Sequence, residues 1–233
     1  FVERLVRVLS NLKNQGKNIV LVSSGAIGVG RAKMGFLQRP DSIPEKQALA
    51  AIGQVNLMYI YSKLFGEYGQ VASQVLLTKD VLDSGEREQN AINTFQTLFR
   101  YNSIPIVNEN DTISTYEMKF GDNDTLSAMV TSLTSADLLI LLSDINGLYD
   151  SDPRKTPGAK LISDVSCVDE RIQSMASNTP GSDIGTGGMT TKIRAAQIAT
   201  ASGADMIIAN GRDVSVLHEI FDDDFIGTHF WAN

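Results

Sequence analysis

The 233-residue chain has few of the residues on which many catalytic sites depend. It contains one cysteine, Cys167, two histidines and one tryptophan. A single cysteine excludes an intrachain disulfide framework and suits a protein of the reducing cytoplasm, which is the location we expect. His218 and His229 are not part of a Cys/His or H-E-x-x-H spacing, and no G-x-S-x-G nucleophile elbow occurs. The sequence therefore offers no zinc motif and no activated serine.

Long apolar runs and an excess of basic residues are also absent. No stretch approaches the roughly 18 consecutive apolar residues of a membrane-spanning helix, so no membrane partner is expected. The chain has 20 Lys and Arg against 27 Asp and Glu, which gives a net charge of −7. Because a nucleic-acid surface needs clustered basic residues, we expect no nucleic-acid partner. A small anion could still bind, since that requires only local positive charge.

What the sequence does contain is an alternation of short apolar segments and helix-like segments. The apolar segments at 19–22, 71–77, 104–108, 137–143 and 205–210 predict strands, and helices are predicted at 2–12, 45–66, 86–101, 124–135, from 189 and from 213. Continuously apolar strands separated by helices indicate a mostly parallel sheet with helices on both faces. We therefore expect an α/β fold, a three-layer αβα sandwich around a mostly parallel central sheet, in a single domain spanning 1–233.

Polar residues follow the predicted strands, where ligands bind in open sheets of this kind. After the first strand, "VSSGAIGVG" joins small residues to a helix start, which suits an anion bound by backbone N–H groups. The alternative is a tight turn that needs small residues for packing. In "NENDTIS", Asp111 could bind an ammonium group and the asparagines a carboxylate or hydroxyl. Its alternative is a capping and turn cluster.

A second acidic segment, "KFGDNDTLSAMV", stands before a predicted helix. Asp122 and Asp124 bracket Asn123 there. Two carboxylates near phosphate-binding loops could place Mg²⁺ or orient lysine side chains. The alternative is that Asp124 is a helix N-cap.

Two later segments are suited to a nucleotide. In "LLILLSDINGLYDSDPR", Ser143 and Asp144 end a strand and could frame a base and ribose, although the turn-rich composition allows a purely structural role. In "GTGGMTTK", Lys192 falls in the first turn of a predicted helix, from which its ammonium could reach phosphates held by the glycines. A solvated surface lysine is the alternative. The segment is neither a Walker A loop nor a G-x-G-x-x-G fingerprint, which disfavours an NAD-dependent Rossmann enzyme.

Taken in this order, "SSGAIGVGR", "NENDTIS", "GDNDTLSA", "LLSDINGLYDSDPR" and "GTGGMTTK" resemble the amino acid kinase superfamily, and within it the branch that phosphorylates glutamate. The similarity covers essentially the whole chain. It implies transfer of the γ-phosphoryl group of ATP, with Mg²⁺, to the γ-carboxylate of L-glutamate, which gives glutamyl 5-phosphate and opens proline biosynthesis. A non-catalytic amino-acid- or nucleotide-sensing module and a related kinase of another carboxylate are the alternatives.

The resemblance also implies roles for individual residues. Ser24, Asp111 and Asn123 would bind glutamate, while Gly25, Asp124 and Lys192 would act in catalysis. ATP would be held by Ser143, Asp144, Thr186, Gly187, Gly188, Met189, Thr190, Thr191 and Lys192. No protein ligand to the metal is assigned, because ATP would carry most of the Mg²⁺. The part up to about residue 135 would mainly serve the amino acid, and the part from about 136 the nucleotide.

Some expectations concern the family rather than residues of this chain. Its members have a first strand with a K-x-G-S/T motif, which Lys13 and Lys17 do not match, and many have a C-terminal PUA-type domain. We expect the motif upstream of Phe1 in the complete protein; 233 residues alone would have activity near zero and partly retained nucleotide binding. Feedback inhibition by proline at a site overlapping that of glutamate, and a homodimer or homotetramer formed through the helix at 45–66, are also implied.

Overall fold

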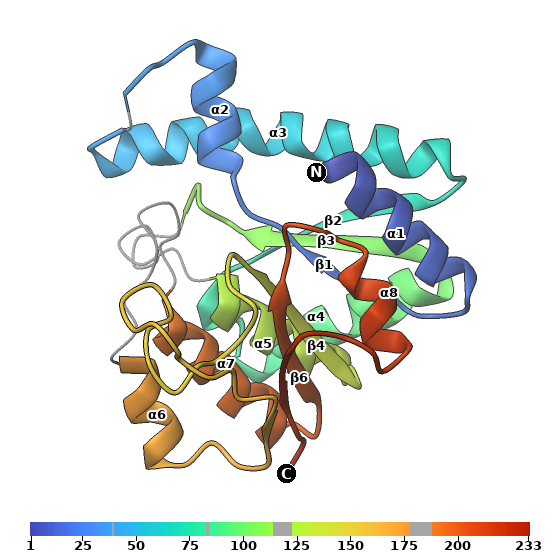
Figure 1. The fold of residues 1–233 in the computed structure, drawn as a ribbon. Helices are drawn as coiled ribbons and strands as arrows, with labels where there is room; N and C mark the ends of the chain where they lie inside the picture. The colour runs from blue at the N-terminus through green and yellow to red at the C-terminus, as the bar shows by residue number, and fades with distance from the viewer. Residues whose placement is uncertain (39, 83, 114–122, 178–187) are drawn as a thin grey trace. The chain divides into compact units, whose positions relative to one another are not determined.

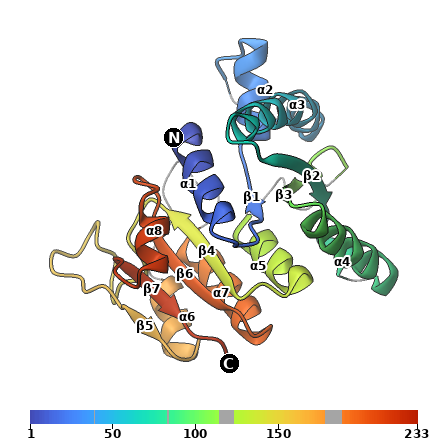
Figure 2. The ribbon, with the colours of Figure 1, turned by 90° about the vertical axis from the view of Figure 1, so that its right-hand side faces the viewer.

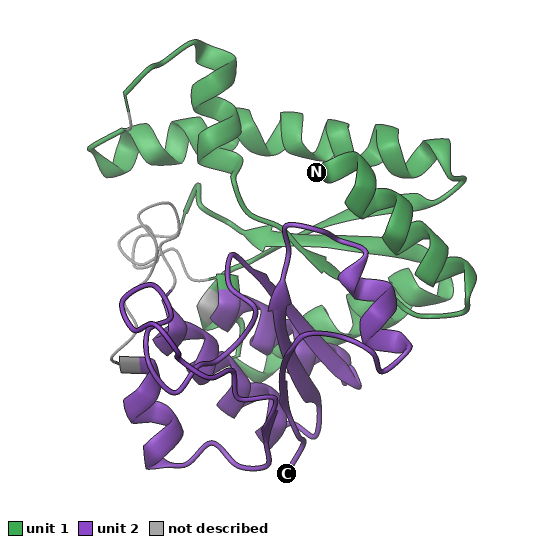
Figure 3. Cartoon of the chain, in the orientation of Figure 1, with its two compact units in different colours: residues 1–123 green, residues 124–233 purple. Residues whose placement is uncertain are grey.

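A computed structural model describes residues 1–38, 40–82, 84–113, 123–177 and 188–233 (Figure 1). The chain divides into two compact units, unit 1 at residues 1–123 and unit 2 at residues 124–233 (Figure 3). The expected α/β fold class is confirmed, with parallel pairing dominant and helices on both faces of the sheets. The described strands form two hydrogen-bonded sheets, one in each unit. Among the described helices, none is both long and apolar enough to cross a membrane.

Unit 1 is a three-stranded parallel sheet with helices on both faces. Its elements are α1 (Val2–Asn14), β1 (Leu21–Val22), α2 (Ala26–Met34), α3 (Ile43–Glu67), β2 (Val71–Leu77), the 3-10 turn η1 (Lys79–Val81), α4 (Gly85–Arg100) and β3 (Ser103–Glu109). The strand order is β1-β3-β2. Every residue of the central strand β3 is buried, as expected for a parallel strand covered on both faces. Figure 2 shows α3 and α4 on opposite sides of this sheet.

Two local features fix α2 and α3. A capping box begins α3: the Ser42 hydroxyl accepts from the Glu45 backbone N–H at 3.4 Å, and the Glu45 carboxylate accepts from the Ser42 backbone N–H at 3.1 Å. The two helices then cross closely at glycines. A Cβ atom at Gly53 would lie 1.7 Å from the Ala26 carbonyl oxygen, and one at Gly30 would lie 1.9 Å from the Leu49 carbonyl oxygen. Only glycine fits at either position.

Unit 2 contains a four-stranded mixed sheet. Its elements are α5 (Asn123–Thr134, whose first residue belongs to unit 1), β4 (Leu138–Ser143), β5 (Asp164–Val165), α6 (Glu170–Ser177), α7 (Met189–Ala201), β6 (Asp205–Asn210), α8 (Val216–Phe221) and β7 (Gly227–Phe230). The strand order is β4-β6-β7-β5, and only the β6–β7 pair is antiparallel. The sequence patterns do not predict β5, α6 or β7, because segments this short show no clear periodicity.

The two faces of the unit 2 sheet are covered by different helices. On β4, Leu139 and Leu141 pack with α5, α6 and α7 in one core cluster. The alternate residues Leu138, Ile140 and Leu142 pack with α8 in another. This alternation is the period-two pattern of a strand buried on both faces. It fixes the register of β4 and so places Ser143 at its carboxyl end.

Candidate active site

The turn that follows β1 presents backbone N–H groups at a helix start. Gly25 is the N-cap of α2 with φ 95°, a left-handed conformation that favours glycine, and as a glycine it has no side chain to cap the helix. The adjacent Ser24 is exposed, whereas Ser23 is buried. An uncapped helix N-terminus has N–H donors available for an anion. The structure thus gives Ser24 and Gly25 the surroundings that an anionic ligand requires.

The same turn is held at Ser23. The Ser23 backbone N–H donates to the Val107 carbonyl at 2.8 Å, which extends the β1–β3 pairing. The Asn123 side-chain amide donates to the Ser23 carbonyl at 2.8 Å. The Ser23 hydroxyl lies 3.0 Å from the Tyr61 hydroxyl on α3. Asn123, which the sequence assigns to substrate binding, is therefore brought next to Ser24 although 99 positions separate them in the chain.

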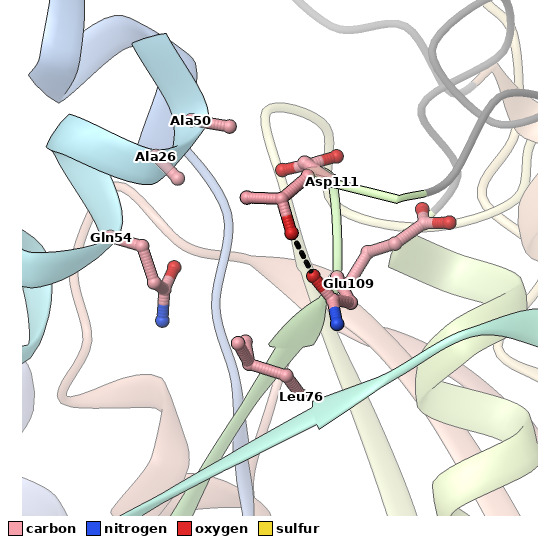
Figure 4. A pocket seen from close by; sticks show the side chains of 8 residues that line it. Ala26, Ala50, Gln54, Leu76, Glu109 and Asp111 are labelled. Atoms are coloured by element: carbon pink, nitrogen blue, oxygen red, sulfur yellow. Dashed lines mark hydrogen bonds between the residues drawn. The ribbon is translucent and has the colours of Figure 1, made fainter. Parts of the chain in front are cut away.

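A pocket with about 180 Å³ of empty space, part of it open to solvent, lies at the carboxyl ends of β2 and β3 (Figure 4). Figure 4 shows the Asp111 side chain across from Ala26 and Ala50, whereas the Glu109 carboxylate points away from Gln54. Leu76, Asn110 and Thr112 complete the lining. The carboxylate of Asp111 in a small pocket suits a ligand that carries an ammonium group. The structure thus places Asp111 in a pocket that also contains the first residue of α2.

Gln54 and Glu109 line this pocket, although the sequence patterns assign neither a role. The Glu109 backbone N–H donates to the Asn108 side-chain oxygen at 2.9 Å, which leaves the Asn108 amide nitrogen to donate to Gln54 Oε1 at 2.9 Å. The remaining Gln54 atom, Nε2, is a buried donor with no acceptor among the residues the structure describes. Glu109 could have been noticed within "NENDTIS". Gln54 has no such signal, because it stands in an apolar helix.

In unit 2, an ion pair stands at the start of α7. Lys192 Nζ lies 2.9 Å from Asp124 Oδ2, with side chains only 12% and 17% exposed. The Thr191 hydroxyl is 2.7 Å from the same oxygen and 2.8 Å from the Gly188 carbonyl, and its single proton can serve one of them at a time. Gly188 is the N-cap of α7, and a glycine has no side chain with which to cap the helix. One ammonium and the N–H groups of the first turn therefore lie close together, with one carboxylate orienting the lysine.

The carboxyl end of β4 bears a second polar group. Arg154 Nη2 donates to Asp144 Oδ2 at 2.7 Å, and the Ser143 hydroxyl is 3.4 Å from Asp144 Oδ1. The Gly211 backbone N–H donates to the Ser143 carbonyl at 2.8 Å, which joins the ends of β4 and β6. Arg154 was not singled out from the sequence, because one arginine in a turn-rich segment carries no distinguishing pattern.

The remaining predicted residues fall into two groups. Met189 is buried at the start of α7, and the Thr190 hydroxyl is 3.4 Å from the Ala176 carbonyl. Asp122, Thr186 and Gly187 lie outside the described residues. In unit 1 the structure brings Asn123 to the turn that contains Ser24. Asp111 lies in the pocket, whose described lining does not include Ser24, Gly25 or Asn123. In unit 2 it brings Asp124 and Thr191 to Lys192.

Comparisons with known proteins bear on the family of the chain. The model of the Amino acid kinase family matches residues 2–210. The chain is 52% identical to a glutamate 5-kinase of Clostridium perfringens, covering 99% of the chain and 87% of that relative. It is 53% identical to a glutamate 5-kinase of Clostridium acetobutylicum, covering 98% and 85%, and 49% identical to one of Listeria monocytogenes, covering 98% and 84%.

Solved structures show the same fold at low identity. A UMP kinase from Ureaplasma parvum superposes with a TM-score of 0.63 at 10% identity, covering 99% of this chain and 88% of the other. An isopentenyl phosphate kinase from T. acidophilum superposes with a TM-score of 0.58 at 15% identity, covering 97% and 89%. These likenesses establish the fold alone. Together with the family match over most of the chain, they leave one assignment: the chain belongs to the amino acid kinase family.

Proposed function

We propose that this protein transfers the γ-phosphoryl group of ATP to the γ-carboxylate of L-glutamate, forming glutamyl 5-phosphate in the first step of proline biosynthesis. The observation that carries the proposal is 52% identity to a glutamate 5-kinase over 99% of the chain. The reaction is a phosphoryl transfer to a carboxyl group, and its location would be the cytoplasm.

Unit 1 would bind the amino acid. Asp111, in the pocket at the end of β3, would pair with the α-ammonium group. Ser24 and Asn123 would donate hydrogen bonds to carboxylate oxygens, and the contact between Asn123 and the Ser23 carbonyl supports their proximity. Gly25 would present its backbone N–H to the phosphoryl group during transfer. The positive φ of Gly25 and the absence of a side-chain cap on α2 support that role.

Unit 2 would bind the nucleotide. The uncapped start of α7, from Gly188 to Lys192, would receive the phosphates. Ser143 and Asp144 would contact the base or ribose. The part up to about residue 135 would therefore mainly bind the amino acid, and the rest mainly the nucleotide. The two compact units at 1–123 and 124–233 support this division.

The chemistry requires alignment and charge stabilisation rather than a general base. A carboxylate is already a competent nucleophile, and phosphoryl transfer spreads negative charge over the transferring oxygens. Lys192 would stabilise that charge, and Asp124, at 2.9 Å, would hold the ammonium in place. A charge that is already in place needs no reorganisation during the reaction. The Asp124 carboxylate would matter because it keeps the Lys192 ammonium in position.

Magnesium would enter mainly with ATP. Among the described residues, no three His, Cys, Asp or Glu side chains are grouped as a metal site. Asp124 would help place the ion mainly by orienting Lys192, since its Oδ2 already accepts from Lys192 and Thr191. The chemistry that the bound ion would supply is positive charge against the phosphate oxygens of ATP. These residues fit a metal that the substrate carries.

A substrate panel tests the proposal. The complete natural protein is assayed with ATP, Mg²⁺ and one acceptor at a time: L-glutamate, N-acetylglutamate, aspartate or carbamate. Hydroxylamine traps an acyl phosphate as a hydroxamate. We expect turnover with glutamate well above the other three acceptors. Turnover with another acceptor, and none with glutamate, would refute the assignment.

We also propose inhibition by proline and self-association. Proline has an α-ammonium and an α-carboxylate, so it would compete for the glutamate site, and inhibition should then be overcome by added glutamate. On α3, Val55 and Tyr59 are 71% and 68% exposed and lie one helical turn apart. This apolar face would pack against a second copy of the chain. Ultracentrifugation of Val55→Glu should then show a smaller species than the natural protein.

A further inference from the structure

The buried hydroxyl pair of Ser23 and Tyr61 is not accounted for by the functions proposed above. The oxygens lie 3.0 Å apart, and the two residues are only 6% and 5% exposed. Burial raises the pKa of the Tyr61 hydroxyl, so it stays protonated at neutral pH. When two buried hydroxyls form a hydrogen bond with each other, removing one leaves the other without a partner. That loss lowers the free energy of unfolding.

This contact joins two walls of the amino-acid site. Tyr61 is on α3, the helix that contributes Ala50 and Gln54 to the pocket. Ser23 directly precedes Ser24 and Gly25. The tyrosine ring is itself fixed, because it stacks on Phe65 with ring centroids 6.4 Å apart. The Tyr61 hydroxyl is thus a hydrogen-bond partner on α3 for the turn after β1, and ring packing helps to hold it in position.

Ser23 is held at three atoms by three different segments. Its N–H bonds to β3, its carbonyl accepts from Asn123, and its hydroxyl pairs with Tyr61. The first two contacts hold the backbone of Ser23, and the third ties its side chain to α3. Small displacements of positioning groups are costly in group transfer, since reacting atoms must be aligned within fractions of an ångström.

We infer that Tyr61 is a positioning residue for the amino-acid substrate: through Ser23, its hydroxyl sets the place of the Ser24 hydroxyl and the Gly25 N–H. The inference rests on the proposed function, because it assumes that this turn contacts the acceptor. Tyr61 touches neither substrate in this account and acts only through Ser23.

The test removes one oxygen atom. Tyr61→Phe retains the ring and its stacking on Phe65, and Tyr68→Phe is the control, since Tyr68 is at the end of α3 and 41% exposed. For Tyr61→Phe we expect the KM for glutamate to rise about five- to tenfold, as the loss of one hydrogen bond implies, with the KM for ATP within about twofold of the natural value. Tyr68→Phe should leave both constants unchanged.

A double-mutant cycle and hydrogen exchange separate positioning from packing. Ser23→Ala should raise the KM for glutamate as Tyr61→Phe does, and the double variant should be no worse than either alone. In Tyr61→Phe, the amides of Gly25 and Ala26 should exchange faster than in the natural protein. A lower Tm with an unchanged KM for glutamate and unchanged exchange at these amides would overturn the inference and leave Tyr61 a packing residue.

Failure of the inference can be told from failure of the proposed function. If the natural protein turns over glutamate but Tyr61→Phe has the same KM for glutamate, only the inference fails. If the natural protein does not turn over glutamate at all, the proposed function fails and the inference about its substrate fails with it.

Discussion

Lys192 is the best-defined cation of the proposed phosphate site. Its Nζ is fixed by Asp124 at 2.9 Å and its side chain is 12% exposed. Removing one preorganised charge from a phosphoryl-transfer site commonly costs about 10²- to 10³-fold in kcat. We therefore predict that Lys192→Ala lowers kcat by about that factor and leaves the KM for glutamate nearly unchanged. Steady-state kinetics with both substrates varied measures this.

Lys155 provides the control for that substitution. Its side chain is 69% exposed, and its nearest carboxylate oxygen, on Asp152, is 4.0 Å away. Lys155→Ala should keep kcat within about twofold, because a loose exposed ion pair contributes little. An equal loss of kcat in Lys192→Ala and Lys155→Ala would contradict the role of Lys192.

Asp111 makes a different prediction, since it would act on binding rather than on transfer. Asp111→Asn removes the negative charge from the pocket while keeping the side-chain volume. A hydrogen bond to a charged group contributes about 1.5–3 kcal/mol, so the KM for glutamate should rise roughly ten- to a hundredfold. The KM for ATP should stay near its natural value. The exposed Asp222 at the end of α8 gives the matched control, Asp222→Asn. An unchanged KM for glutamate in Asp111→Asn would refute the assignment.

At the scale of single elements, continuous apolar runs were the most informative sequence feature. The predicted strands at 71–77 and 205–210 coincide with β2 and β6, because each is a run of mostly apolar residues bounded by turn-forming ones. The helix predicted from residue 45 begins at Ile43, since the capping box at Ser42 starts it two residues earlier. The S-x-x-E pattern at 42–45 marks this start in the sequence.

Contacts between distant segments could not be predicted in the same way. Ser24 and Asp111 follow apolar strands, which marks them as candidates, and the family resemblance implies their role in binding glutamate. Nothing local in the sequence links Tyr61 to Ser23, because their contact depends on how α3 crosses the start of α2. The pairing of Arg154 with Asp144 depends likewise on the path of a loop ten residues long. The end of a strand can be recognised from the local sequence. The hydrogen-bond partner of a side chain depends instead on how distant segments pack.

The crossing of α2 and α3 yields a prediction of its own. At Gly53 a Cβ atom would meet backbone atoms, the Ala26 carbonyl oxygen at 1.7 Å and the Gly30 nitrogen at 2.6 Å, and backbone cannot move aside as a side chain can. Overpacking of this kind costs about 1–3 kcal/mol and sometimes more, so Gly53→Ala should lower the free energy of unfolding by at least about 2 kcal/mol. It should also raise the KM for glutamate, because Ala26 and Ala50 line the pocket.

Gly66 is the control on the same helix. A Cβ atom there would have no atom within 4 Å, so Gly66→Ala should be neutral or stabilising by about 0.5–1 kcal/mol. Denaturant unfolding of both variants gives the comparison. Equal stability of Gly53→Ala and the natural protein would show that the close crossing does not hold in solution.

At the scale of the whole molecule, the two compact units suggest that each substrate protects its own part of the chain. A ligand slows amide exchange where it buries or orders backbone groups. Glutamate would contact the turn after β1 and the end of β3, both in unit 1. ATP would contact the end of β4 and the start of α7, both in unit 2. The roles proposed for single residues thus predict which regions of the chain each substrate protects from amide exchange.

Hydrogen exchange measured with each substrate alone tests that statement. With ATP and Mg²⁺, we predict slower exchange in peptides covering 143–146 and 188–193, and little change at 23–27 and 108–112. With glutamate, we predict the reverse. L-alanine at the same concentration is the control, because it has the α-ammonium and α-carboxylate but no γ-carboxylate to be phosphorylated. Protection of 188–193 by glutamate alone, without protection at 108–112, would contradict the division. Asp111 is the residue proposed to receive the ammonium group, whereas the start of α7 presents N–H donors and the Lys192 ammonium, which suit phosphate.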